Sequence, residues 1–314
     1  MTSDTSLSNN QVSHFKTFGF LILKNLLDHA SIDHWRQQIW RELETSLETP
    51  ETWTKRGGLD GYQYDPPESA LVHHPALTSI IQQLGGGAFV PSGGIPITRW
   101  ARKEKSWQMP KPGHIDAYGG RWLPFMIGAT TYLYDVEPGG GAFIFWPCSH
   151  HAAHRYFLEN PAHVDGSFLR TRNFSWDIFC DNPETGGKEF VAHAGDVVLW
   201  HSYPTHEGSI NINDSPRIAF FARWHHHRRC APAFRYEIPN DLWKYWAILG
   251  EICVLSRIAI ILEYQSVRII LVGKEFVIIL LTPTFTWQQT CLRECKYWMT
   301  NSSFILEHSY NNLK

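Results

Sequence analysis

The sequence predicts a mainly β fold, in which short strands form a sandwich or barrel and α-helices flank it. From about residue 95 to residue 224, short apolar or alternating runs are separated by Gly, Pro, Asp and Asn, which is the pattern of successive short strands and turns. The runs are Thr130–Tyr134, Ala142–Trp146, Val197–Trp200 and Ile218–Trp224. We therefore place the β core at about residues 95–230.

The part before the β core predicts three helices and one short strand. Val12–Phe20 is typical of a helix that leads into the apolar strand Leu21–Leu23. Residues 28–31 supply capping groups for a second helix, because short polar side chains bind the free N–H groups of a first turn. The apolar stripe of that helix consists of Ile32, Trp35, Ile39 and Leu43. A third helix over Pro75–Leu84 begins with proline and stops at a run of glycines.

Four local motifs favour structural interpretations. Gly139–Gly141 lies between two strand-like runs without a following Lys-Ser/Thr, so it predicts a hairpin turn and not a phosphate cradle. His225–His227 is interpreted as a solvated basic strand end, because consecutive residues of a strand alternate between its faces. His150–His151 is predicted to lie in a turn. His73–His74 precedes a helix and is expected to have no partner.

The composition excludes some classes of partner. A chain of 314 residues with 43% hydrophobic content can bury a large core. Its formal net charge of -2 gives no field that would attract nucleic acid or an anionic membrane. We therefore expect a small-molecule substrate, with no nucleic acid and no membrane partner, and the oligomeric state stays open. The six cysteines lack the spacing of a disulfide framework, and the polar start does not resemble a signal peptide, so we expect a reducing, cytoplasmic setting.

The chain changes character after about Ile248. Residues 249–314 are Ile-rich and lack a turn rhythm, and charged residues interrupt each apolar run before it reaches the roughly 20 residues of a membrane span. Cys291 and Cys295 are four residues apart but have no second pair, so they do not predict a zinc site. We expect one domain over residues 1–248 and a C-terminal extension. That extension is either an accessory amphipathic segment or sequence never selected to fold.

His114-Ile115-Asp116 is the most informative motif of the chain. Residues two apart on a strand project to the same face, so this histidine and this carboxylate can bind one metal ion together. His206 follows His114 by 92 residues and offers a third ligand. Two histidines and one carboxylate fill one face of an octahedron and leave the other positions open, as in non-haem Fe(II) oxygenases.

The distal part of the motif has two candidate histidines and one arginine. His201 and His206 both follow the strand-like run that ends at Trp200, and Arg217 lies 11 residues after His206. The residues around Arg217 are strongly apolar, so its guanidinium needs a buried anionic partner. A planar fork of this kind matches the far carboxylate of 2-oxoglutarate with two hydrogen bonds. His201 would then be a core or supporting histidine.

These residues resemble the phytanoyl-CoA dioxygenase-like family over roughly residues 12–248. The resemblance rests on four sequence motifs. They are Phe15 with Gly19-Phe20, Gly113-His114-Ile115-Asp116, Pro138–Phe143 continuing to Pro147-Cys148-Ser149-His150, and the block from Gly195-Asp196 through His201, His206, Gly208-Ser209, Asn211 and Arg217. The last block is the most specific, because family members share a histidine five residues before the ligand histidine and an arginine eleven after it. Nothing after about Ile248 resembles the family.

The resemblance implies an Fe(II)- and 2-oxoglutarate-dependent oxygenase with a double-stranded β-helix, the jelly roll of cupin-like proteins, and helices packed outside it. It implies that His114, Asp116 and His206 hold Fe(II), that Arg217 anchors 2-oxoglutarate, and that dioxygen is consumed. The implied reaction is hydroxylation of an unactivated C–H bond of a small organic substrate, with release of succinate and carbon dioxide.

Five further side chains are candidates for contacts in such a site. Thr130 and Tyr132 follow the metal pair on a predicted strand, and their hydroxyls are candidate contacts to 2-oxoglutarate. Tyr118, Trp122 and Trp146 are candidates for lining the substrate pocket, although aromatic residues of such folds more often pack in the core.

Two other functions use the same residues. A non-catalytic cupin-like protein would bind a metal or a small molecule without turnover, and a zinc hydrolase would use the same two histidines and carboxylate. The presence of Arg217 at the family spacing disfavours both. The carboxylate of Asp116 disfavours halogenation, because related halogenases carry a small residue at that position.

Overall fold

The computed structural model describes residues 5–53, 59, 61–116, 118, 126–184, 186–228, 231 and 236–247, together with the backbone of two strands between residues 267 and 280. The chain divides into two compact units, Met1–Ile248 and Leu249–Lys314. In the second unit, the strands β10 (Val267–Val272) and β11 (Glu275–Leu280) pair with each other in antiparallel register. No helix in the described part of the chain is both long and apolar enough to cross a membrane.

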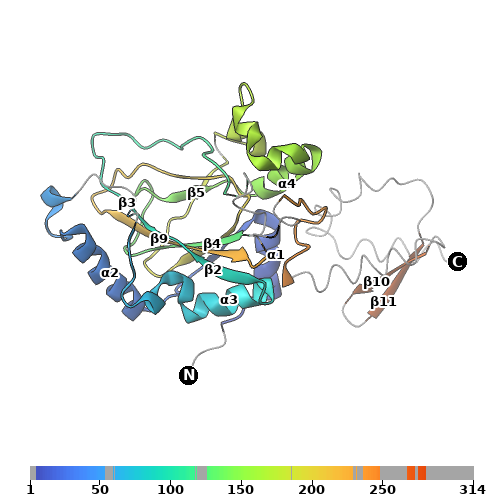
Figure 1. Cartoon of the computed structure of the whole chain (residues 1–314), viewed down its shortest axis with the longest axis horizontal. Coiled ribbons are helices and arrows are strands. Elements are labelled where there is room, and N and C mark those ends of the chain that lie inside the picture. The colour runs from blue at the N-terminus through green and yellow to red at the C-terminus, as the bar shows by residue number, and fades with distance from the viewer. Residues whose placement is uncertain are drawn as a thin grey trace, which may run out of the picture. The chain divides into compact units, whose positions relative to one another are not determined.

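Two antiparallel sheets form the centre of the first unit (Figure 1). The large sheet has the order β1-β7-β4-β9-β2, with β3 also paired to β9, and the small sheet has the order β6-β5-β8. The strands are β1 (Phe20–Leu23), β2 (Phe89–Gly93), β3 (Pro96–Arg99), β4 (Met126–Tyr132), β5 (Phe143–Phe145), β6 (Lys188–Glu189), β7 (Val197–His201), β8 (His206–Gly208) and β9 (Arg217–His226). The predicted jelly roll is confirmed.

The core lies between the two sheets. One buried cluster contains side chains of β4, β7 and β9 from the large sheet and of β5 from the small one: Tyr132, Phe143, Phe145, Val198, Trp200, Ala219 and Phe221. Inward residues alternate with outward residues along each strand, so each of these strands contributes every second side chain. This core fixes the inner face on which the candidate site is built.

Helices cover the outer faces. The α-helices are α1 (Asn9–Phe18), α2 (His29–Leu43), α3 (Pro75–Gly85) and α4 (Ser149–Glu159), and the 3-10 helices are η1 (Pro50–Thr52), η2 (Pro67–Ser69), η3 (Leu71–His73), η4 (Pro161–Asp165), η5 (Ser167–Arg170) and η6 (Trp176–Phe179). In Figure 1, α2 and α3 run along one side of the strands and α4 lies on the opposite side. Trp35 of α2 packs against Phe220 of β9, with ring centroids 5.5 Å apart.

The predicted helices before the β core are confirmed, and their termini show why they form. Asp28 caps α2 by accepting a hydrogen bond from the backbone N–H of Ser31 at 2.8 Å, and the predicted stripe of α2 is buried. The third predicted helix, α3, begins at Pro75. It ends at Gly85 and is capped by Gly86, whose φ of 56° lies in the left-handed region that favours glycine.

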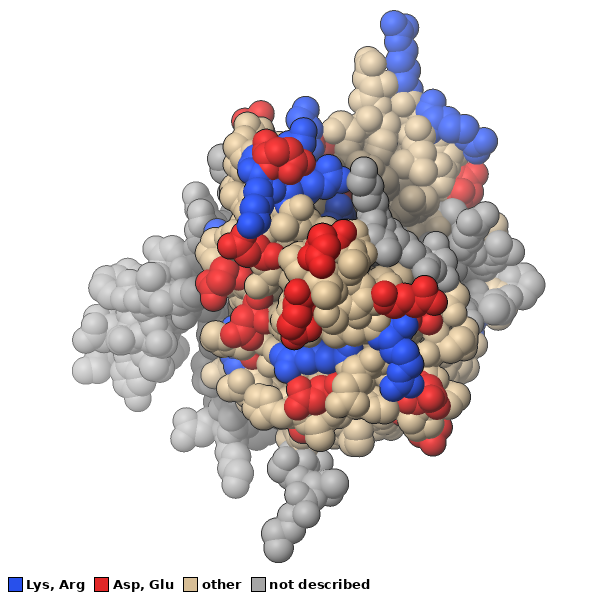
Figure 2. Space-filling model, turned by 90° about the vertical axis from the view of Figure 1, so that its left-hand side faces the viewer, with Lys and Arg blue, Asp and Glu red and all other residues tan. Residues whose placement is uncertain are grey.

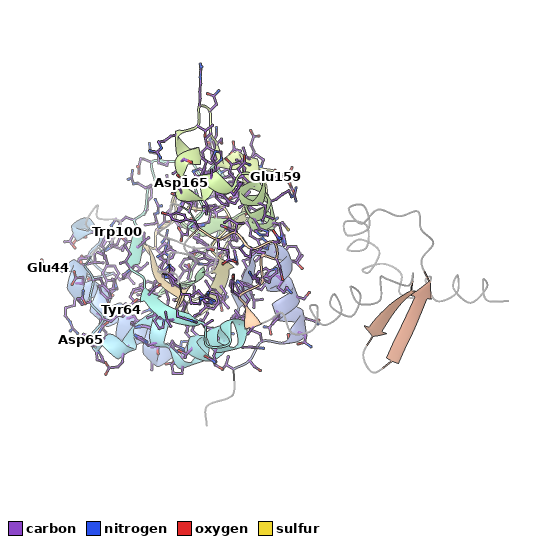
Figure 3. All side chains as sticks on the ribbon, turned by 45° about the vertical axis from the view of Figure 1, so that its right-hand side comes forward. Glu44, Tyr64, Asp65, Trp100, Glu159 and Asp165 are labelled. Carbon is purple, nitrogen blue, oxygen red and sulfur yellow. The ribbon has the colours of Figure 1, made fainter. Side chains whose placement is uncertain are left out.

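Aromatic side chains fill the space between the outer helices and the large sheet. Figure 3 labels Tyr64 and Trp100 on the α2 side of the molecule. Tyr64 meets the ring of Phe220 edge-on at 5.6 Å, and Trp100 stacks on Trp53 at 5.2 Å. Glu159 and Asp165, also labelled in Figure 3, mark the end of α4 and η4 at the other side. Many of the aromatic residues are therefore structural, as the sequence predicted.

Four local predictions need correction. His150 and His151 lie in α4 and not in a turn, and the fully buried ring of His150 bonds the carbonyl oxygen of Lys16 at 3.0 Å. His225 and His226 are buried and not solvated, because β9 lies between β4 and β2. His74 has a partner, since its Nε2 lies 3.1 Å from Oδ2 of Asp28.

The fourth correction concerns the glycine-rich segment. It does form a turn, in which the N–H of Gly140 donates to the carbonyl oxygen of Glu137 at 2.9 Å. The turn is not a hairpin, because the strands on either side of it, β4 and β5, belong to different sheets. It therefore carries the chain from the large sheet to the small sheet.

Candidate metal centre

The backbone brings the two predicted metal-binding segments side by side. His114 and His206 form an isolated antiparallel bridge in which each N–H donates to the other's carbonyl oxygen, at 3.1 and 2.9 Å. The N–H of Asp116 donates to the carbonyl oxygen of Ser202 at 3.0 Å. Residues 114–116 therefore run extended beside the chain that enters β8, and this pairing turns the side chains of His114 and Asp116 to one side.

The three side chains form a compact group. One nitrogen of each histidine and one oxygen of Asp116 lie within 4.8 Å of one another. Oδ1 of Asp116 lies 3.5 Å from Nε2 of His114 and 3.9 Å from Nε2 of His206. The side chain of His206 is 6% exposed and that of His114 is 45% exposed, so the group sits at the rim of the core and is open to solvent on the His114 side.

Hydrogen bonds and burial fix the protonation of this group. Nδ1 of His206 lies 3.0 Å from the carbonyl oxygen of Pro204 and must donate its proton there, which leaves the lone pair of Nε2 facing Asp116. Burial, together with the charge of His114, lowers the pKa of His206 to about 4. Burial is the largest single influence on His114 and lowers its pKa, but the hydrogen bond to Asp116 and the negative charges of Asp116 and Glu207 together outweigh it, so the pKa is raised.

The carboxyl group of Asp116 is ionised. Burial opposes its ionisation, but the hydrogen bond from His114 and the electrostatic effects of the neighbouring His206 and Arg223 together outweigh burial and lower its pKa. The group thus offers a charged oxygen beside two imidazole nitrogens. This donor set suits Fe(II), for which a facial arrangement of two histidines and one carboxylate is the usual protein environment. The residues present therefore fit the metal of the family that the sequence resembles.

Arg217, the predicted anchor of 2-oxoglutarate, begins β9 and is 2% exposed. Its Nε donates to the carbonyl oxygen of Gly141 at 2.7 Å, and its Nη1 donates to that of Ile97 at 3.1 Å. Burial lowers its pKa to about 10, so the guanidinium still carries its charge at neutral pH. Among the described residues, no carboxylate lies within ion-pair distance of it. A buried guanidinium needs an anionic partner, and for Arg217 this partner is thus not a side chain of the described residues.

Thr130 and Tyr132 lie on β4 and are fully buried. The indole N–H of Trp200 donates to Oγ1 of Thr130 at 3.1 Å, and the N–H of Phe143 donates to the hydroxyl oxygen of Tyr132 at 2.8 Å. Burial raises the pKa of Tyr132 to about 12. Both hydroxyls therefore already support the core, and contact with 2-oxoglutarate stays a prediction for each of them.

The other candidates lie outside the metal group. His201 is fully buried and stacks on Trp246 at 5.3 Å, which agrees with a core position. Trp146 is 2% exposed, and its indole N–H donates to the carbonyl oxygen of Pro183. The ring of Tyr118 packs against Phe168 at 5.4 Å. Trp122, Cys291 and Cys295 lie outside the described residues.

The sequence interpretation missed Arg223. Its Nε and Nη2 lie 3.3 and 3.2 Å from Oδ2 of Asp116. A signal was present, because Arg223 follows Arg217 by six residues on one strand, and residues an even number apart on a strand share a face. Nothing in the sequence indicated that Asp116, 107 residues earlier, would lie opposite.

The chain is similar to several solved structures. Apo EctD from S. alaskensis matches with a TM-score of 0.50 and 14% identity, covering 72% of this chain and 79% of EctD. HygX from Streptomyces hygroscopicus, crystallised with nickel and 2-oxoglutarate, matches with a TM-score of 0.48 and 18% identity, covering 71% of this chain and 88% of HygX. The carbocyclase SnoK from nogalamycin biosynthesis matches with a TM-score of 0.49 and 20% identity, covering 72% and 86%.

A family model gives the decisive comparison. No curated protein sequence is significantly similar to the chain. The model of the phytanoyl-CoA dioxygenase family matches residues 15–219, which is more than half of the chain and includes the metal group and Arg217. The chain therefore belongs to the phytanoyl-CoA dioxygenase family of Fe(II)- and 2-oxoglutarate-dependent oxygenases.

Proposed function

We propose that this protein hydroxylates an unactivated C–H bond of a small organic substrate, with conversion of 2-oxoglutarate and dioxygen to succinate and carbon dioxide. The observation that carries the proposal is the compact group of two imidazole nitrogens and one ionised carboxylate oxygen within 4.8 Å. His114, Asp116 and His206 would hold Fe(II). When bound, the iron supplies the oxidative chemistry that no amino acid side chain provides.

Three residues of the site have separate roles in the proposed reaction. His206 presents an unprotonated Nε2 because its other ring nitrogen is committed to Pro204. Arg217 would pair with the far carboxylate of 2-oxoglutarate, since its charge is buried and its described partners are only neutral carbonyl oxygens. The half-exposed side of His114 is the side from which a substrate can approach.

The substrate is expected to be small and not a polyanion. On the face of the molecule in Figure 2, acidic and basic side chains are intermingled and neither sign forms a continuous field. Such a surface gives no long-range attraction for nucleic acid. We infer a soluble small-molecule substrate that reaches the metal group by diffusion.

An anaerobic titration with Fe(II) and 2-oxoglutarate tests the proposal. The parent protein should develop the weak visible charge-transfer band of a chelated 2-oxo acid, and His206→Ala should not. Arg217→Ala should need about 10- to 100-fold more 2-oxoglutarate, because a charged hydrogen-bonded pair contributes about 1.5–3 kcal/mol. His193→Ala is the matched control, since its side chain is 71% exposed and pairs with Asp135.

The outcomes separate the competing functions. Absence of the band in folded, iron-loaded parent protein would exclude 2-oxoglutarate as cosubstrate and favour a binding protein or a zinc hydrolase. If the band forms, substrate-dependent release of succinate identifies true substrates. The mass of each product then distinguishes hydroxylation, which adds one oxygen atom, from desaturation or cyclisation, which removes two hydrogen atoms.

A further inference from the structure

The carboxylate of Asp116 has two oxygens, and the structure gives them different partners. Oδ1 faces the Nε2 atoms of His114 and His206. Oδ2 accepts hydrogen bonds from both Nε and Nη2 of Arg223. Two donors of one guanidinium thus converge on a single oxygen and fix the rotation of the carboxylate about its side-chain bond.

Arg223 is itself held in place by one wall of the core, which consists of Gly128, Thr130 and Trp200. Its guanidinium carbon lies 5.6 Å from the ring centroid of Trp200, a cation–π contact. The indole N–H of Trp200 donates to Thr130, and the indole ring also packs against the ring of His206 at 5.1 Å. Trp200 is 1% exposed, so this wall is rigid.

Gly128 makes room for the indole in that wall. A Cβ atom at this position would lie 2.1 Å from two carbon atoms of the Trp200 indole, much closer than carbon atoms can approach. The indole therefore lies directly over the backbone of β4, with the guanidinium of Arg223 beside it. Gly128, Trp200 and Thr130 together determine where Arg223 can lie.

We propose that Arg223 is a positioning residue that holds Asp116 so that Oδ1 alone is presented to the metal. This inference rests on the proposed function, because it assumes that Asp116 is a ligand. An octahedral ion with three protein donor atoms keeps three positions open, whereas a second carboxylate oxygen would occupy one of them. Two positions are needed for 2-oxoglutarate and one for dioxygen. A one-oxygen carboxylate is thus a condition of the reaction.

The positioning role predicts the opposite result from a role of charge alone. A nearby guanidinium repels a metal cation, so if its charge were all that mattered, Arg223→Gln would bind metal more tightly and Arg223→Lys would be unchanged. If Arg223 positions Asp116, both substitutions remove the two-donor contact. Both should then weaken metal binding by about 10- to 100-fold, the usual effect of losing a partner of a metal ligand.

The test uses Co(II) with the full-length protein, without 2-oxoglutarate or substrate. Co(II) affinity is measured by calorimetry, and its visible absorption reports the number and arrangement of ligands. In Arg223→Lys and Arg223→Gln, we expect weaker binding, because Asp116 is no longer held in the orientation that suits the metal. We also expect an altered band intensity, because the freed carboxylate can rotate and change the arrangement of the ligands. Arg99→Gln is the matched control. The side chain of Arg99 is 43% exposed, its Nη2 lies 4.0 Å from Oε1 of Glu207, and in the described part of the chain no hydrogen bond or ion pair joins it to Asp116.

Each outcome is informative. Unchanged affinity and spectrum in both Arg223 variants, or tighter binding in Arg223→Gln, would overturn the positioning role while Co(II) binding by the parent protein kept the metal centre intact. Failure of the parent itself to bind Co(II) would instead count against the proposed function. Circular dichroism and thermal unfolding of each variant establish that it is folded, and Arg223→Lys keeps the test decisive if Arg223→Gln does not fold.

Discussion

Strand β9 places two arginines on the inner face of the large sheet, Arg217 at its start and Arg223 six residues later, and the two have opposite surroundings. Arg217 is almost fully buried, and its hydrogen bonds to described residues go to two carbonyl oxygens. The side chain of Arg223 is 28% exposed and is paired with the carboxylate of Asp116. Of the two arginines on this strand, only Arg223 has its charge balanced by a carboxylate among the described residues.

This difference in surroundings supports a different role for each arginine. A buried charge without a counter-charge is costly, and proteins keep such a charge where a ligand supplies the missing one. Arg217 is in this position, which suits recognition of a carboxylate of 2-oxoglutarate. Arg223 already has its carboxylate, so its contribution is to the geometry of Asp116. We therefore propose that Arg217 serves the ligand and that Arg223 serves the geometry of the protein.

The largest expected effect comes from changing the carboxylate between Arg223 and the metal group. In Asp116→Asn, the donors of Arg223 require an acceptor, so the amide oxygen should turn to Arg223 and the amide NH2 should turn to the histidines. An NH2 group has no lone pair for a metal. We expect loss of Co(II) affinity of more than about 100-fold, beyond the effect of losing a supporting partner. Calorimetry measures it, and near-normal affinity would show that Asp116 is not a ligand.

The second prediction separates the two arginines directly. Arg217→Lys keeps the charge but not the planar fork, so affinity for 2-oxoglutarate should fall about tenfold, while Co(II) affinity without 2-oxoglutarate stays within about twofold. In Arg223→Lys, the affinity for Co(II) should fall more than the affinity for 2-oxoglutarate. Titrating Co(II) and 2-oxoglutarate into each variant measures the four affinities that the comparison needs. If both variants lost affinity for the same ligand to the same degree, the proposed contrast between Arg217 and Arg223 would be incorrect.

Part of this arrangement could be predicted from the sequence because it is local. Some features depend only on residues that are close together in the sequence. These are the cap of α2 at Asp28, the start of α3 at Pro75 and the spacing of His114 and Asp116. The burial of His226 is not local, because it depends on Phe89 and Tyr245, whose rings pack against it from distant segments. Likewise α4 follows Cys148, which is in a left-handed conformation and forms no side-chain cap, so its start carries no capping signal.

Arg223 shows the same limit inside the site. Period-two alternation from Arg217 places it on the inner face, but its role depends on Asp116 and on Trp200, which come from other segments of the fold. The metal motif was recognisable because its spacing is a family signature, whereas a supporting contact across 107 residues has no local pattern.

The third prediction tests the wall on which Arg223 lies. In Gly128→Ala, the new methyl group would overlap the indole of Trp200, so Trp200 or the backbone of β4 must shift. Overpacking of this kind costs about 1–3 kcal/mol of unfolding free energy. Because Trp200 contacts both Arg223 and His206, Co(II) affinity should fall as well. Denaturant unfolding and calorimetry check both effects. Lower stability with unchanged metal affinity would show that the wall does not support the site.

The smallest expected effect distinguishes two roles of Thr130. If its hydroxyl contacts 2-oxoglutarate, Thr130→Val should weaken 2-oxoglutarate binding and leave Co(II) binding alone. The hydrogen bond from Trp200 favours the other role, in which Thr130 supports the wall beneath Arg223. Thr130→Val should then cost about 1–3 kcal/mol of stability, because it leaves the buried indole N–H without its acceptor, and should weaken Co(II) binding only slightly. Comparing Thr130→Val with Thr130→Ser, which keeps the hydroxyl, isolates the hydrogen bond from the change in shape. A selective loss of 2-oxoglutarate affinity in Thr130→Val would instead assign Thr130, like Arg217, to binding of 2-oxoglutarate and not to support of Arg223.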